Sequence, residues 1–299
     1  MTTAPILLFV YNRPHHTQHT LDALKKNTLA TESTLYIYSD AARSEADIEN
    51  VTKVREIIRV IDGFKEVIIV EREKNWGLAR NIIDGVTERV NQYGQVIVLE
   101  DDLVTSPYFL QFMNDALATY RDEPRVGHIY ACDYTQDSNL PDTYLIKWTG
   151  SWGWATWDRA WKHFNPDGKF LLDELRRRKL THTFDFNGTY RYTRMLQQQV
   201  EGKNNSWAIR WNTSLFLNDI LSLNVGKSLV RNIGLDGSGT HCGNERLYDS
   251  ILYMHPLPVV KISPIEENTI GRLALEQYYR RTNSFLAKAI RRIRKIIHL

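Results

Sequence analysis

Short apolar segments recur along the first third of the chain, and longer segments with helical spacing separate them. The apolar segments are residues 5–11, 33–40, 65–71 and 95–100. The helical segments between them are residues 14–26, 45–61 and 77–92, the first of which opens on a proline, a residue tolerated in a first helical turn. This alternation predicts βαβ units, and therefore a mainly parallel sheet covered by helices on both faces.

The second half of the chain is less regular. Residues 126–133 and 143–148 are expected to form further strands. Helices are expected at residues 170–179, 188–201 and 206–218. The sequence shows no internal repeat, low-complexity linker or clear domain boundary, so we expect one continuous domain whose second half is built onto the first.

Composition places the chain among ordinary folded proteins, because 42% of its 299 residues are hydrophobic and 24% are charged. Cys132 and Cys242 lie far apart and fit neither a disulfide framework nor a metal-binding pair. No apolar run approaches the roughly 20 residues of a membrane-spanning helix, and the N-terminus lacks the basic leader of a signal peptide. These features predict a cytoplasmic protein.

The basic charge is concentrated at the C-terminus. Residues 280–299 carry seven Lys and Arg and no acid, so the net charge of +3 becomes −4 without them. Apolar residues recur there at three- and four-residue spacing, which predicts an amphipathic helix. Such a helix could lie on an anionic membrane surface, at the inner face of a bacterial cell membrane, or dock on its own domain. Nucleic acid is not an expected partner, because the basic charge is confined to this tail.

Three consecutive acids, Glu100, Asp101 and Asp102, stand at the end of the apolar segment 95–100. On an extended strand end Glu100 and Asp102 point to the same side, and Asp101 points away. Carboxylates at the carboxyl end of a parallel strand suit Mg²⁺ or Mn²⁺, whose remaining positions water and a substrate phosphate would fill. The alternative is that the acids cap a helix beginning near residue 107 or are simply solvated.

Six segments together resemble nucleotide-sugar glycosyltransferases of the GT-A fold, in particular the N-acetylglucosaminyltransferase I group and bacterial family 2-like sugar transferases. The segments are PILLFVYNRP, YIYSD, NWGLARN, VIVLEDDL, HIYACD and WTGSWGWATWDRAW. The resemblance runs from about residue 4 to residue 164, with weaker matches to about residue 242. It implies a Rossmann-like, mainly parallel sheet flanked by helices. It also implies a single domain over residues 1–270, with a nucleotide-binding half (1–121) and an acceptor half (122–270), before the basic tail at 271–299.

The acids acquire specific roles from this resemblance. Asp102 is expected to contact the Mn²⁺ or Mg²⁺ that bridges the two phosphates of the donor. Glu100 and Asp101 are expected to face the donor's sugar and ribose. A competing phosphatase pattern would require a nucleophilic aspartate at the position of Glu100, and this mismatch disfavours a phosphatase.

Further donor contacts are expected from the loops that follow the strands. Arg13, with Tyr11 and Asn12 beside it, resembles the arginine that meets the nucleotide. Asp40 resembles the acid that binds a uracil edge, and Arg80 resembles a residue near the donor at the start of the third helix. Two alternatives are purely structural: Asp40 could cap a helix, and Arg80 could pair with the acid one turn later on its own helix.

Five of the eight tryptophans fall between residues 148 and 161. Trp154, Trp157 and Trp161 repeat at helical spacing, which favours a place in the core over ligand contact. Trp152 precedes Gly153 in an expected loop, where an aromatic ring can pack on the C–H face of a sugar. The stretch containing Trp152, Gly153 and Trp154 is therefore predicted to form a wall of the donor-sugar or acceptor site.

The general base is the weakest part of the resemblance. The family places an aspartate directly before a tryptophan that opens a late helix, but Asn204, Asn205 and Ser206 occupy these positions here. Ser206 is instead expected to cap the helix. The candidate bases are Asp236 and His241 in the segment GLDGSGTHC and Asp133 in the segment HIYACDY. His241 is also a candidate metal ligand, unless its glycine-rich loop is an ordinary turn.

The sequence therefore predicts a hexosyltransferase, inverting if the family's stereochemistry holds, that moves a sugar from a UDP-sugar to a hydroxyl of a polysaccharide or lipid-linked acceptor. A catalytically silent, membrane-surface scaffold is the alternative, because the family's base is missing. A nucleotidyltransferase is disfavoured, since YNRPHH at residues 11–16 is not the glycine-rich, basic loop that such enzymes carry after the first strand.

Overall fold

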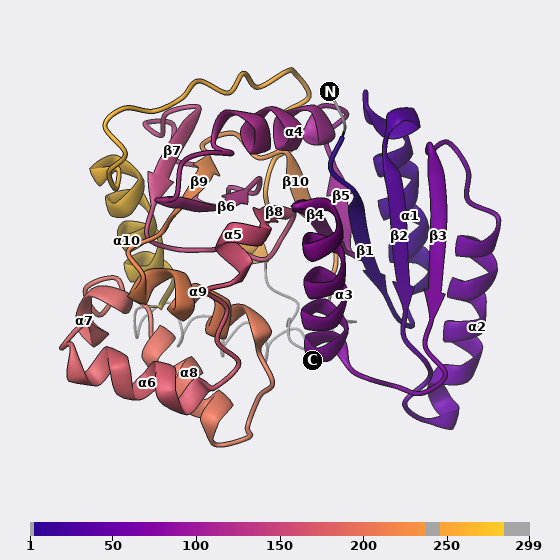
Figure 1. Ribbon diagram of the computed structural model, residues 1–299, viewed down its shortest axis with the longest axis horizontal. Coiled ribbons are helices and arrows are strands. Elements are labelled where there is room, and N and C mark those ends of the chain that lie inside the picture. The colour runs from indigo at the N-terminus through magenta and orange to yellow at the C-terminus, as the bar shows by residue number, and fades with distance from the viewer. Residues whose placement is uncertain (1–2, 237–245, 284–299) are drawn as a thin grey trace, which may run out of the picture.

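The computed structural model describes residues 3–236 and 246–283, which form an eight-stranded sheet with helices on both faces (Figure 1). The strand order is β3-β2-β1-β4-β8-β6-β9-β7. These strands are β1 Ile6–Val10, β2 Thr34–Ser39, β3 Glu66–Glu71, β4 Gln95–Glu100, β6 Val126–Tyr130, β7 Thr143–Ile146, β8 Trp154–Trp157 and β9 Leu221–Val225. A separate ribbon pairs β5 Leu103–Thr105 with β10 Val230–Asn232.

The first four strands of the sheet run parallel, as the sequence predicts. β1 lies between β2 and β4, and β3 pairs with β2 at the edge. The second half of the chain extends the same sheet through β8, which is antiparallel to both β4 and β6. The expected α/β fold with a mainly parallel sheet is therefore confirmed. Because β1, β2 and β4 are parallel, the loops that follow them meet at one edge of the sheet.

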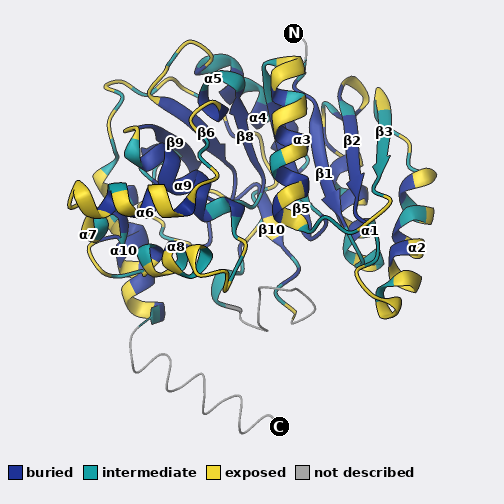
Figure 2. Cartoon of the chain, turned by 60° about the horizontal axis from the view of Figure 1, so that its bottom comes forward, coloured by how far each residue is buried: buried dark blue, intermediate teal, exposed yellow. Residues whose placement is uncertain are grey.

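Helices cover the two faces of the sheet as separate layers. The helices are α1 Pro14–Lys25, α2 Glu45–Arg59, α3 Leu78–Tyr93, α4 Phe109–Thr119, α5 Asp158–Trp161, α6 Gly168–Arg177, α7 Thr181–Phe184, α8 Tyr192–Val200, α9 Trp207–Leu217 and α10 Thr269–Asn283, with short 3-10 turns at Ala30–Glu32 and Arg246–Tyr248. Alternate residues of β1 separate into two apolar clusters, one packed against α1, α2 and α4 and the other against α3, α5 and α9. Figure 2 shows buried strands beneath helices with exposed outer faces.

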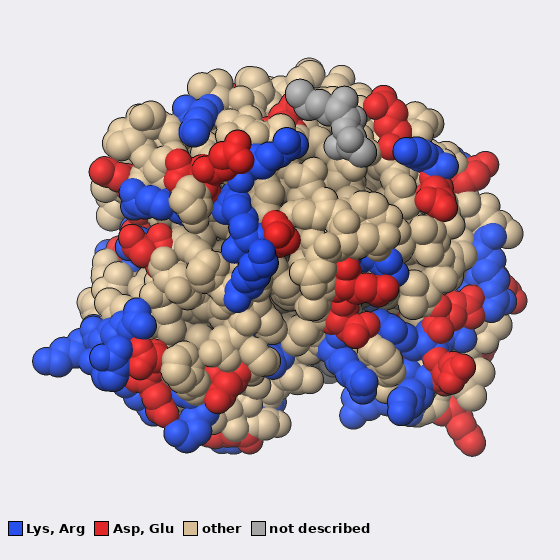
Figure 3. Space-filling view, viewed as in Figure 1, with Lys and Arg blue, Asp and Glu red and all other residues tan. Residues whose placement is uncertain are grey.

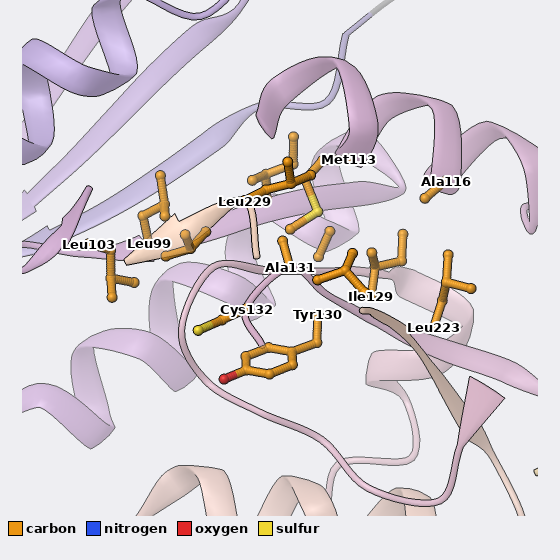
Figure 4. Packing of buried hydrophobic residues seen from close by; sticks show 14 of the residues in the cluster. Leu99, Leu103, Met113, Ala116, Ile129, Tyr130, Ala131, Cys132, Leu223 and Leu229 are labelled. Carbon is orange, nitrogen blue, oxygen red and sulfur yellow. The ribbon is translucent and has the colours of Figure 1, made fainter. Parts of the chain in front are cut away.

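The two halves of the chain share a core. Figure 4 shows side chains of β4 and α4 packed with side chains of β6 and β9, including Leu99, Met113, Ile129 and Leu223. All four belong to one cluster of buried residues. The second half therefore contributes directly to the same buried cluster as the first half.

The segment containing Trp154 and Trp157 forms strand β8, although its spacing suggests a helix. Residues three apart on a strand point to opposite faces, so Trp154 joins the cluster under α3 and α9, and Trp157 joins the other cluster. Both faces of the sheet are covered, and both rings are buried. A short strand buried on both sides cannot be distinguished from a helix by apolar spacing alone. The expectation that these tryptophans lie in the core is confirmed.

Helix α10 docks on the sheet and does not project from it. Its Gly271 lies against the ring of Tyr144 on β7, and Ala274, Leu275 and Tyr279 are buried. This agrees with the docked alternative for residues 271–283 of the predicted tail. Residues 284–299, which carry most of the predicted amphipathic pattern, lie outside the described residues. Among the described residues, no helix is long and apolar enough to cross a membrane.

A buried histidine gives the fold a predicted sensitivity to acid. The ring of His128 on β6 is fully buried; Trp211 donates its indole N–H to Nδ1 at 3.1 Å, and Nε2 lies 3.0 Å from the carbonyl oxygen of Gly150. Burial lowers the pKa of His128 to about 3. The unfolded chain binds this proton near pH 6.5, so stability falls as pH drops from about 6.5 toward 3, by at most about 1.4 kcal/mol per pH unit.

Urea unfolding at several pH values tests this expectation. The variant His128→Gln should be less stable at neutral pH, because it disturbs the pair of hydrogen bonds, yet lose less stability than the parent between about pH 6.5 and pH 4. Equal losses in the two proteins over this range would show that His128 binds a proton in the folded protein as readily as in the unfolded chain.

Candidate active site

The three acids lie where β1 and β4 end side by side. Phe9 of β1 pairs with Glu100 of β4, so the loop after β1 runs directly beside Asp101 and Asp102. The guanidinium of Arg13, from this loop, forms an ion pair with Asp101 and lies 3.0 Å from Oδ2 of Asp102. Residues far apart in sequence thus form one charged cluster, at the lower edge of the sheet in Figure 1.

The cluster carries more negative than positive charge. Burial raises the pKa of Glu100, and repulsion from Asp102 and Asp101 raises it further. Burial also raises the pKa of Asp101, although Arg13 opposes this shift. Within the described residues Glu100 has no hydrogen bond or ion pair. One arginine therefore offsets three acids, and an added cation would relieve the repulsion that remains.

The backbone holds these acids in place. The hydroxyl of Thr20 on α1 donates to the carbonyl oxygen of Asp101 at 2.8 Å, and the amide of Ile233 donates to that of Asp102 at 2.8 Å. Gly234 follows, and a Cβ at this position would overlap both Asp102 and Arg13. The segment after β10 consequently passes directly against the cluster, and only glycine permits this approach.

Asp102 retains one carboxylate oxygen for a ligand. Its side chain is 10% exposed, Oδ2 accepts the bond from Arg13, and Oδ1 has no hydrogen-bond partner among the described residues. In the described ranges, no group of three or more His, Cys, Asp or Glu side chains is arranged to hold a metal ion. The oxygen donors fit Mg²⁺ or Mn²⁺ bound through one or two carboxylates, with water and phosphate completing the shell. Arg13 already contacts Asp102, so a cation and Arg13 would share this carboxylate.

Asp40, at the end of β2, has a clear structural role. Its Oδ1 accepts hydrogen bonds from the amides of Ala41 and Trp76, both at 2.9 Å, and its Oδ2 accepts one from Gly77 at 2.8 Å. The carboxylate thereby fixes the turn that leads into α3, which agrees with the capping alternative. Contact with a uracil edge stays a prediction.

The other residues expected at the donor surround this edge. The amide of Tyr11 donates to Asp101 at 3.4 Å, and the side chain of Asn12 donates to Asp47 of α2 at 2.6 Å.

Arg80 is exposed and lies 4.0 Å from the ring centroid of Trp76. The acid one turn later, Asp84, pairs with Arg72 at 2.7 Å and not with Arg80. The cluster Arg13, Tyr11, Asp101 and Asp102 is one contact group, and Arg80 stands apart from it beside Trp76.

The predicted aromatic wall needs correction. Trp154 has no exposed surface and stacks on Trp207 with ring centroids 5.1 Å apart, so it is a core residue and cannot contact a sugar. Gly153 has φ of 69°, and a Cβ there would press on Val230, so glycine serves the turn and the close approach of β10. Trp152 is partly exposed and lies edge-on to Tyr134 and Tyr248. Only Trp152 can still face a ligand.

The three candidate bases differ in exposure and in their contacts. Asp236 lies two residues after Gly234; its side chain is 51% exposed, and its Oδ2 is 3.2 Å from Nε2 of His16. Asp133 is buried, and its carboxylate accepts three hydrogen bonds from Thr135 and Gln136. Its carboxylate is committed to stabilising a turn, so we no longer expect it to act as the base. His241 lies outside the described residues.

Sequence patterns did not reveal several residues near this edge. His16 contacts Asp236 from the first turn of α1, and the role of Gly234 depends on a strand pairing that the sequence does not show. Arg210 is buried in α9. A signal for Arg210 was present, because a lone charge within the apolar stretch WAIRWNTSLFL is unusual.

Comparison with known proteins finds only distant likenesses. No family model matches the sequence, and no curated protein matches it. The mannosyltransferase PcManGT from Pyrobaculum calidifontis, solved with GDP-Man and Mn²⁺, is 10% identical, with a TM-score of 0.43 over 73% of this chain and 70% of that chain. TarS from S. aureus is 17% identical, with a TM-score of 0.31 over 46% and 23% of the two chains. A Desulfovibrio desulfuricans protein named as a nucleotide-diphospho-sugar transferase is 11% identical, with a TM-score of 0.37 over 71% and 99%. Such TM-scores are too low to transfer an activity.

Proposed function

We propose that this protein is a divalent-metal-dependent glycosyltransferase that moves a sugar from a UDP-sugar to a hydroxyl of a polysaccharide or lipid-linked acceptor. The single observation that carries the proposal is the cluster of Arg13 with Glu100, Asp101 and Asp102 at the carboxyl edge of the parallel strands. An arginine beside an excess of carboxylates matches the mixed needs of a metal ion and a diphosphate.

Asp102, Arg13 and Glu100 of the cluster each have a chemical task in this proposal. Asp102 would hold the metal through its free Oδ1, and the metal would stabilise negative charge on the departing nucleoside diphosphate. Arg13 would bind a phosphate oxygen through its guanidinium, and Tyr11 and Asn12 would border the nucleotide. Glu100 would face the sugar on the side of the sheet under α3.

Asp236 is the base that we propose for the acceptor hydroxyl. It is exposed, it follows the segment packed against Asp102, and its neighbour His16 can hold its carboxylate in place. If this carboxylate takes the proton from an acceptor hydroxyl on the face of the sugar opposite the departing diphosphate, direct displacement gives inversion at the sugar. His241, in the segment that follows, stays a candidate metal ligand.

Calorimetry with UDP tests the binding half of the proposal. We expect a dissociation constant on the order of micromolar to tens of micromolar with Mn²⁺ present, and at least about tenfold weaker binding with EDTA. GDP and UMP are the reference ligands, because the first changes the base and the second removes a phosphate.

The rival interpretation is a silent scaffold, and the same titration separates the two. The scaffold is favoured by the Arg13 ion pairs, which already neutralise part of the acid cluster without a ligand. It predicts no heat with any nucleotide, with or without metal. Binding followed by metal-dependent release of UDP from a UDP-sugar would exclude it.

A further inference from the structure

An open cavity lies between helices α3 and α9. Its volume is about 410 Å³, which is large enough for a sugar residue, and it is lined by Arg80, Ile83 and Asp84 of α3 and by Asn205 and Arg210 from the start of α9. Figure 3 views the face of the molecule that carries α3, where the surface is hollowed at the lower edge between the two halves. The cavity is separate from the ion pairs of Arg13.

Arg210 is buried and has no acidic partner among the residues that the structure describes. The residue is 7% exposed, and its guanidinium donates to the carbonyl oxygens of Ser206 at 3.1 Å and Pro166 at 3.3 Å and to Oδ1 of Asn205 at 3.4 Å. Burial lowers its pKa, and no charged group among the described residues opposes the shift. Arginine has five N–H donors, so part of the guanidinium is left for another acceptor. Buried charges are usually paired, which makes this arrangement unusual.

The other charges around the cavity do not supply the missing anion. Asp84 is engaged by Arg72 at 2.7 Å. Arg80 stacks on Trp76 at 4.0 Å and forms no ion pair among the described residues. The N-terminal end of α9, which also favours negative charge, begins beside Asn205. The cavity is therefore electropositive and suited to an oxyanion.

The cavity opens on the side of the sheet that Glu100 faces. Alternate residues of β4 share a face, and Val96 and Val98 belong to the cluster with Ile82 of α3 and Trp207 of α9. Glu100, two residues beyond Val98, points to the same side. The cavity and the sugar-facing acid of the proposed enzyme consequently lie on one face, near one edge.

We propose that the cavity between α3 and α9 binds an anionic group of the acceptor sugar, a carboxylate or a phosphate, through Arg210, with Arg80 contributing from its more exposed side. The inference that the ligand is an acceptor rests on the proposed function. The planar fork of arginine matches both oxyanions, and a buried arginine with no protein counter-charge gains its partner from the ligand. A neutral sugar has no anionic group with which to bind Arg210.

Binding of simple sugars to the intact protein tests this directly. The probes are methyl glucuronide, methyl glucoside 6-phosphate and methyl glucoside, titrated by ligand-observed NMR with and without UDP and Mn²⁺. We expect at least one charged probe to bind about tenfold more tightly than the neutral probe. Preference for the glucuronide identifies a carboxylate acceptor, and preference for the 6-phosphate identifies a phosphate. Equal affinity of all three probes under both conditions overturns the proposal.

A matched pair of variants assigns the effect to Arg210 without unfolding the helix. Asn205→Asp keeps the size of the side chain and gives Arg210 its own carboxylate, so the advantage of the charged probe should fall to about the level of the neutral probe. Gln92→Glu adds the same charge at the exposed far end of α3, where Arg89 already contacts the side chain, and should leave the advantage unchanged. An unchanged advantage in Asn205→Asp would overturn the assignment.

The proposal can fail independently of the glycosyltransferase. Binding of UDP is measured on the same samples, so UDP binding with no preference for charged sugars rejects the anion site alone. If the protein never binds UDP but prefers charged sugars, and Asn205→Asp abolishes that preference, the anion site is supported and the proposed enzyme is rejected.

Discussion

Replacing Asp102 by asparagine is expected to lower the rate of UDP release from a UDP-sugar by about a thousandfold, because the loss of a bound metal removes several kcal/mol of stabilisation from the departing diphosphate. Asparagine keeps the shape of the side chain but not its charge. Arg13 retains Asp101 as a partner, so the variant should fold. The measurement is release of UDP from a panel of UDP-sugars at saturating Mn²⁺.

Asp122→Asn is the matched control, because it removes one exposed carboxylate at the C-terminal end of α4, away from the cluster. It should retain the parental rate. If Asp102→Asn also retained the parental rate at the same Mn²⁺ concentration, the metal could not be held by this carboxylate, and the proposed role of the cluster would be wrong.

Replacing Arg13 by glutamine is expected to destabilise the metal-free protein by about 3 kcal/mol, because breaking a buried ion pair leaves carboxylates without their counter-charge. The side chains of Asp101 and Asp102 are 6% and 10% exposed, so solvent screens them weakly. The loss should be measured by urea unfolding. The loss of stability should grow between about pH 5 and pH 8. A carboxyl group whose pKa is raised in the folded state destabilises that state increasingly as pH rises toward the raised pKa.

Two further measurements check this explanation. Arg43→Gln removes an exposed arginine from the loop before α2 and should cost little. Adding Asp101→Asn to Arg13→Gln should recover part of the lost stability, because it removes one of the repelling charges. A loss of stability that is independent of pH and is not relieved by Asp101→Asn would mean that Arg13 acts through packing alone.

The parallel half of the fold and the position of the acids could be predicted from the sequence. Each strand from β1 to β4 is a short apolar run followed by polar residues, and parallel topology brings the carboxyl ends of the strands to one edge. The proximity of Arg13 to Asp102 follows from that topology. Both belong to loops after adjacent strands, so the local sequence pattern was sufficient to predict that they lie close together.

Other features depend on contacts that local patterns do not encode. Asp40 binds the amides of Trp76 and Gly77, more than thirty residues away, so a site role and a capping role look alike in the sequence. Trp154 was included in the predicted wall as part of the stretch around Gly153, but Gly153 accommodates Val230 and Trp154 lies in the core. Arg210 has significance only because α9 packs beside α3 at a place where no acid of the described residues pairs with it.

The most direct test of the metal and diphosphate site is electron paramagnetic resonance of Mn²⁺ titrated into the protein with UDP present. The proposed site predicts one tightly bound Mn²⁺ per chain in the parent, weaker binding without UDP, and loss of the bound ion in Asp102→Asn but not in Asp122→Asn. Equal Mn²⁺ binding by the parent and Asp102→Asn, or no dependence on UDP, would contradict it.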